Sequence, residues 1–138
     1  MSIQFIPSRA VLADEAIESL SVYEDFEAEV NITALQAVYI SSSGKVSPAL
    51  ATGAPQDKVV GFATQSKLAT ETVRVRKMGV LSGFSGLTQD VLYYLDTSVA
   101  GDITNVLPTG SGESVVKVGL AKSSTELDIV IQILSRRA

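Results

Sequence analysis

The residues best suited to holding a metal ion lie in one short loop. Asp96 and Asp102 supply two carboxylates, Thr97 and Ser98 supply two hydroxyls, and Gly101 allows a tight turn. Calcium prefers such oxygen ligands, but an EF-hand loop of this kind also needs acidic or amide side chains between them and a terminal Glu. The pattern therefore predicts an ordinary turn, and we expect no metal site.

Two glycine-rich stretches have the spacing of catalytic or phosphate-binding loops but lack their partner residues. Residues 109–113 read TGSGE, with no Lys after the second glycine and no helical pattern behind it, so we predict a flexible hairpin loop. The GFSG stretch at 83–86 offers Ser85 as a nucleophile, yet a nucleophile elbow needs a His partner. We assign these glycines to turns.

Histidine and cysteine are absent from the chain. This removes the usual general base near neutral pH, Ser-His and Cys-His nucleophile pairs, thiolate metal sites and disulfides. Carboxylates on adjacent residues, such as Asp14 with Glu15 or Glu24 with Asp25, diverge and are typical of a solvated acidic face. We therefore expect no catalytic residue, no cofactor-binding residue and no cofactor, and we predict that the protein is not an enzyme.

The charge pattern argues against nucleic acid and membrane as partners. The net charge is −4, and the one basic group, Arg74, Arg76 and Lys77, alternates with Val as in a strand with a charged outer face. No apolar run has the length of a signal-peptide core or the roughly 20 residues of a membrane span. We expect a protein made in the host cytoplasm.

Short apolar stretches separated by Gly, Ser, Thr, Asn and Pro dominate the chain from Val30 onward, a pattern typical of many short strands joined by turns. We predict an all-β fold with a sandwich or barrel-like core. The domains expected are an N-terminal arm at 1–30 and a β domain at 31–138. The predicted strands are 37–41, 59–64, 72–80, 91–95, 115–121 and 127–134.

A degenerate internal repeat joins these strands into two similar β units, at about 37–80 and 91–134. VYI at 38–40, VGFA at 60–63 and VRV at 73–75 match YYL at 93–95, VGLA at 118–121 and IVI at 129–131. Such a repeat predicts two units that bury apolar faces against each other. Gly61 and Gly119 interrupt strands, where a bulge or a close backbone approach is expected.

The N-terminal arm differs in composition, with seven acidic residues between 14 and 29. Ile17, Leu20 and Tyr23 recur at a three-residue spacing that a short helix would place on one face. The arm either folds onto its own domain as an edge element or reaches to a neighbouring molecule. Its apolar residues are the candidates for contact with a neighbouring molecule or subunit: Ile3, Phe5, Ile6, Val11, Leu12, Tyr23 and Phe26.

The segment from about 32 to 133 resembles a family of repeated-β virion proteins of tailed bacteriophages, found as capsid decoration (cement) proteins and in tail-fibre or spike modules. The resemblance is carried by ITALQAVYISSSGKV at 32–46, VVGFA at 59–63, GLTQDVLYYL at 86–95, AGDIT at 100–104, PTGSG at 108–112 and VGLAKSSTEL at 118–127. Two turns depart from the expected pattern, because Leu35-Gln36 and Gln89-Asp90 replace Gly-containing pairs.

The resemblance implies a structural virion protein on the outer capsid surface, where it stabilises the head by clamping neighbouring major capsid protein subunits. It also implies self-association as a homotrimer. The alternative is a receptor- or glycan-binding module of a tail fibre or spike. For that role the chain offers Tyr93 and Tyr94 and no Trp, and only one of two adjacent strand residues can join an aromatic platform.

Overall fold

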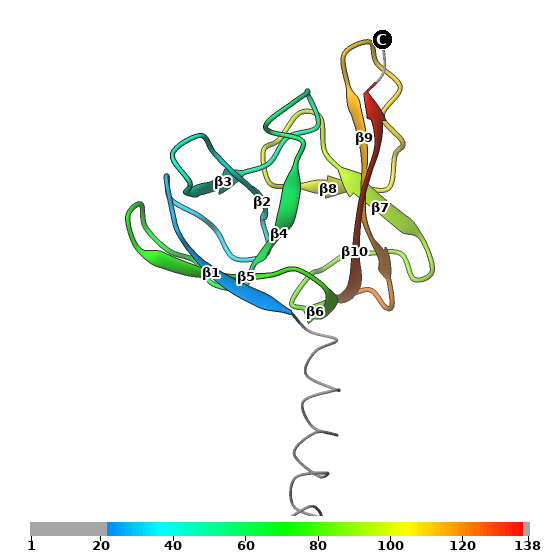
Figure 1. The fold of residues 1–138 in the computed structure, drawn as a ribbon. Helices are drawn as coiled ribbons and strands as arrows, with labels where there is room; N and C mark the ends of the chain where they lie inside the picture. The colour runs from blue at the N-terminus through cyan, green and yellow to red at the C-terminus, as the bar shows by residue number, and fades with distance from the viewer. Residues whose placement is uncertain (1–21, 137–138) are drawn as a thin grey trace, which may run out of the picture.

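The computed structural model describes residues 22–136, which form two five-stranded antiparallel sheets (Figure 1). No helix occurs among these residues. The all-β prediction is confirmed. The strands of the first sheet are β1 (Tyr23–Glu27), β2 (Ala37–Ile40), β3 (Val46–Pro48), β4 (Val59–Ala63) and β5 (Thr72–Arg76). Those of the second are β6 (Gly79–Ser82), β7 (Leu92–Leu95), β8 (Ile103–Thr104), β9 (Ser114–Ala121) and β10 (Glu126–Arg136).

The two sheets have the same topology. The order is β1-β5-β4-β2-β3 in the first and β6-β10-β9-β7-β8 in the second, so each strand of one sheet has a counterpart five strands later. We call residues 23–76 the first unit and residues 79–136 the second unit. The predicted repeat is therefore present, but its units are longer than the sequence pattern indicated. The first unit begins with β1, which was assigned to the arm, and the second begins with β6, whose first residues were joined to the preceding strand.

The first sheet curls into a barrel-like form (Figure 1). Ala28, just after β1, makes a parallel bridge to Val46 at the start of β3 and thereby brings the two edges of the sheet together. The interior of the curl is filled by small apolar side chains. These are Ala28, Ile32, Val38, Val46, Ala63, Val73 and Val75, with Phe26 and Val60 packed against them.

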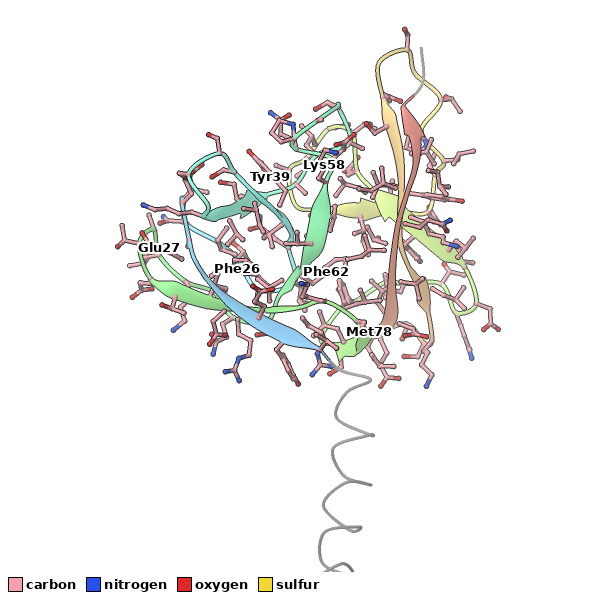
Figure 2. The ribbon with its side chains drawn as sticks, viewed as in Figure 1. Phe26, Glu27, Tyr39, Lys58, Phe62 and Met78 are labelled. Atoms are coloured by element: carbon pink, nitrogen blue, oxygen red, sulfur yellow. The ribbon has the colours of Figure 1, made fainter. Side chains whose placement is uncertain are left out.

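A second core joins the two units. It combines Ala37, Val59 and Phe62 of the first unit with residues of the second, among them Leu81, Tyr93, Leu95, Val116, Val118, Leu127 and Ile129. The Phe62 ring meets Phe84 edge-to-face at 5.9 Å between centroids, and Figure 2 shows Phe62 lying between the two sheets. Because Phe62 is fully buried at this contact, the units form one packed body.

Gly61 and Gly119 occupy equivalent positions where neither strand has room for a side chain. A Cβ on Gly61 would lie 2.4 Å from the Arg76 carbonyl oxygen, and one on Gly119 would lie 2.5 Å from that of Asp128. A register shift lies beside each glycine. The expectation of a bulge or close backbone approach is confirmed at both positions.

The third part of the predicted repeat is wrong in register. Ala63 pairs with Val75 in the first unit, and Ala121 pairs with Leu127 in the second, so VRV at 73–75 corresponds to TEL at 125–127 and not to IVI at 129–131. The sequence comparison matched β-branched residues, whereas the pairing is fixed by the close backbone contacts at the two glycines. IVI was available for this wrong match because β10 is longer than β5 and continues to Arg136.

The predicted strand at 72–80 is two strands in different sheets. β5 ends at Arg76, and β6 begins at Gly79, whose φ is 98°. Such a φ is easily reached only by glycine, so the chain turns here and crosses from the first unit to the second. The Val-Arg alternation ends at Arg76, but Val80 follows closely with only three residues between, which is why the segment resembled one strand.

Residues 23–27 were assigned to the arm but form β1, which pairs with β5 over its whole length. This part of the segment is an edge element of its own domain, one of the two alternatives considered. Tyr23 is in a strand, so the helical spacing through Tyr23 is wrong at that residue. Ile17 and Leu20 lie outside the described residues.

The loop at 105–113 is not a hairpin, contrary to prediction. β8 and β9, which it connects, both border β7, so the loop crosses from one side of β7 to the other. The connection from β3 to β4 does the same around β2 in the first unit. Strand order of this kind depends on long-range pairing that the local turn residues do not specify.

The two turns that depart from the family pattern are equivalent in structure. Gln36 N–H donates to the Thr33 carbonyl and Val91 N–H to the Thr88 carbonyl, each closing a four-residue turn. Leu35 and Asp90, at the third positions, have φ of 75° and 66°. Both units therefore keep the turn geometry that glycine normally provides.

Candidate contact surfaces

The acidic residues considered for metal binding or catalysis form turn and surface contacts. Asp96 Oδ1 accepts the N–H groups of Thr97 and Ser98 at 2.7 and 3.2 Å, so this carboxylate caps its own loop. Across residues 22–136 no three acidic side chains gather as a candidate metal site. The same part of the chain contains no helix of the length and apolarity needed to span a membrane.

Glu29 holds the two edges of the first sheet together. Its N–H donates to the Val46 carbonyl at 2.9 Å, and its carboxylate accepts hydroxyls from Ser41, Ser43 and Ser47 across the β2–β3 turn. The hydroxyl donors, Ser41 first and Ser43 next, hold the pKa of Glu29 below its ordinary value of 4.5. The ionised form therefore stabilises the closed curl.

Two ion pairs connect β1 with β5 and with the residue that follows it. Arg74 Nε lies 3.0 Å from Asp25 Oδ1, and Lys77 Nζ lies 3.0 Å from Glu24 Oε1. The hydrogen bond that Arg74 donates to the Asp25 carboxylate raises the pKa of Arg74. All four side chains are 40–54% exposed, so the pairs add little stability and mainly keep this edge of the sheet solvated. The prediction of a strand with a charged outer face is confirmed.

An exposed apolar group surrounds the point where residue 22 enters the domain. Val22, Tyr23 and Met78 are 37%, 45% and 46% exposed, and we call these three residues the arm base. Lys77 N–H donates to the Val22 carbonyl at 2.6 Å, which ties the arm base to the link between the two units. Figure 2 shows Met78 beside the starts of β1 and β6. Sequence reasoning missed Met78, because nothing local marked residues 77–78 as an inter-unit link.

The guanidinium of Arg76 fixes the position of Tyr23. It lies 4.7 Å from the centre of the Tyr23 ring, while that of Arg74 lies 5.5 Å from the same ring. Arg76 also donates to the Tyr23 hydroxyl and to the Val80 carbonyl of β6. The ring is therefore held on the surface by cation–π and hydrogen-bond contacts, with one side open.

The structure separates the sequence-predicted contact residues. Tyr23 is exposed at the arm base, whereas Phe26 packs against the core of the first unit and lies within its curl in Figure 2. Phe26 thus has a structural role in its own domain. The remaining candidates lie outside the described residues: Ile3, Phe5, Ile6, Val11 and Leu12.

The second unit has an apolar outer face that we call the open face. It consists of Leu92 and Tyr94 on β7, Lys117 and Leu120 on β9, and Asp128, Val130 and Gln132 on β10. Leu92 is paired with Leu120, and Leu120 with Asp128, so these side chains share one side of the sheet. Leu92, Leu120 and Val130 are 40%, 38% and 51% exposed.

Sequence reasoning missed the open face, although a signal was present. β7 reads LYYL, four apolar residues in a row. Because successive side chains of a strand point to opposite sides, two of these four must face outward. The structure resolves which: Tyr93 is buried, and its hydroxyl accepts the Thr88 N–H at 2.9 Å. Tyr94 lies on the open face.

A groove of about 470 Å³ lies at the junction between the two units. Its lining includes Leu35, Gln36, Phe84, Tyr93 and Asp102. Tyr93 is 6% exposed, so its ring forms part of the floor and offers no open platform for a sugar. The sequence matches no protein-family model and no curated protein.

Proposed function

We propose that this chain is a non-enzymatic structural protein of a phage virion. In this role it binds the outer capsid surface as a homotrimer and stabilises the head by clamping neighbouring major capsid protein subunits. The observation that carries the proposal is the rigid pair of similar β units with exposed apolar groups at two separate places. A body of this kind can hold two neighbours at a fixed spacing.

The rigid junction is what a clamp requires. Phe62, Val59 and Ala37 of the first unit are buried in a core shared with the second, so a force applied to one unit is transmitted to the other. A hinge at this point would let neighbouring capsid subunits separate. Many weak contacts repeated by symmetry then give strong binding to a shell without any single strong site.

The arm base lies at this junction. Val22 is hydrogen-bonded to Lys77 in the link between the units, so the preceding residues leave the domain where both units meet. In the proposed contact the apolar residues of the arm, Ile3, Phe5, Ile6, Val11 and Leu12, bind the capsid. Tyr23 and Met78, which are exposed on the domain, add to this contact.

The test is co-sedimentation of the full-length protein with undecorated shells of its phage. We expect the protein to pellet with shells at a fixed ratio. The double variant Phe5→Ser/Ile6→Ser and the variant Met78→Ser should each lower the bound fraction at limiting protein. Leu68→Ser, at a side chain that is 62% exposed on the first unit, is the matched control and should bind normally.

Two results would contradict the proposal. A protein that stays in the supernatant with shells, while binding to host cells or their surface glycans, would instead support the tail-fibre module. Normal shell binding by both arm-base and arm variants would remove the arm from the contact.

A further inference from the structure

The open face differs from its counterpart in the first unit in whether another part of the described chain covers it. The row Ala37–Phe62–Arg76 of the first unit corresponds to the row Leu92–Leu120–Asp128 of the second by strand pairing. Ala37 and Phe62 are fully buried, because the second unit packs on them. Leu92 and Leu120 are exposed on the described chain.

The apolar character of the open face is not shared by the other outer face. On the outer face of β1 and β5, the exposed side chains Asp25 and Arg74 form an ion pair. On the second unit Val130 adds to the pair of leucines. Its neighbours Ile129 and Ile131 pack into the core, so strand alternation directs Val130 outward. Contiguous apolar surface bordered by polar groups is characteristic of an interface.

We propose that the open face binds a second copy of this chain. Two observations favour this occupant. The equivalent face of the first unit is covered by the second unit of the same chain. The open face of the second unit can therefore pack against a β unit of another copy in a similar way. The open face also carries Lys117, paired with Gln132, and Asp128, paired with Leu120, at separate places on adjacent strands, and such a surface is complementary in charge to another copy of itself.

A closed ring of copies satisfies both charges. In a cyclic assembly one side of the open face meets the other side of the face on the next copy, so Lys117 of each copy faces Asp128 of its neighbour. Leu92, Leu120 and Val130 then meet at the centre and leave water. The inference deepens the proposed function, because it assigns the self-association of the proposed trimer to a surface, but its test needs no capsid.

The test measures the mass of the full-length protein by sedimentation equilibrium over a range of concentrations. We expect wild type to be a multimer. Leu120→Lys buries a charge at the centre of the contact, so the dissociation constant should rise by about 30-fold or more. Leu68→Lys introduces the same charge at an exposed site of the first unit and should leave the mass unchanged. Unchanged thermal unfolding of dilute protein confirms that each variant folds.

A charge exchange tests the pairing itself. Lys117→Glu and Asp128→Lys should each weaken assembly, and the double variant should restore it, because the exchanged charges attract again. Monomeric wild type at every concentration, an assembled Leu120→Lys variant, or a double variant no better than the single ones would each overturn the inference. Shell binding by a monomeric Leu120→Lys protein would leave the capsid role intact, so the two proposals can fail separately.

Discussion

Replacing Gly61 by Ala adds a single methyl group at a position with no room for it. The new Cβ would lie 2.4 Å from the Arg76 carbonyl oxygen and 2.6 Å from a Val75 methyl carbon, against an ordinary contact of about 3.5 Å or more. The obstacle is backbone, so β4 and β5 must move apart. Overpacking of this kind costs about 1–3 kcal/mol, and backbone displacement favours the upper half of that range.

Ala would otherwise be favourable in a strand, because it lowers the conformational entropy of the unfolded chain by about 0.4–1 kcal/mol. We expect a net loss of about 1–2 kcal/mol from this balance, or roughly 4–8 °C in the unfolding temperature of a domain of this size. Calorimetry and urea unfolding of the full-length protein measure both quantities. Gly119→Ala should show a similar loss, since its Cβ would lie 2.5 Å from the Asp128 carbonyl.

Gly110→Ala is the matched control. Its Cβ would also meet close atoms, but these belong to the end of the Glu113 side chain, which can rotate away. We expect a change in stability well below that of the two strand glycines. Equal stability of Gly61→Ala and wild type would refute the close-approach argument, and a loss at Gly61 without one at Gly119 would refute the equivalence of the two units.

Two further predictions concern the Glu29 hydrogen bonds that join the edges of the first sheet and the contact between the units at Phe62. The pKa of Glu29 is lowered in the folded state, so its stabilisation is present above pH 4.5 and is lost as the pH falls through the folded value. Below pH 4.5 the unfolding temperature of Glu29→Gln should fall less than that of wild type. Parallel curves of unfolding temperature against pH would show that ionised Glu29 does not stabilise the sheet. Phe62→Ala should cost about 3–5 kcal/mol in urea unfolding, because the ring is fully buried between the units, whereas Leu68→Ala at an exposed site should cost far less. A Phe62→Ala protein as stable as the control would mean that the units are not joined through this core.

The sequence predicted the features that depend on local composition. Short apolar stretches between turn residues indicated an all-β chain, and the matched VGFA and VGLA segments indicated two similar units. The close approaches at Gly61 and Gly119 were recognisable because glycine within a strand marks a place where another backbone leaves no room for a side chain. The positive φ of Leu35 and Asp90 was harder to predict from the sequence, because it is imposed by the turn that each unit repeats.

Features that depend on pairing between distant segments were decided by the tertiary structure. The alternation at 72–80 carried no sign that Gly79 divides it between two sheets, and residues 23–27 resembled an acidic arm until their partner in β5 was known. The same holds for the candidate surfaces. Phe62 and Leu120 are equivalent apolar residues in sequence, yet one is buried and the other exposed, because only the first unit is covered by its neighbour. Burial is a property of the whole packed chain, which a local pattern does not contain.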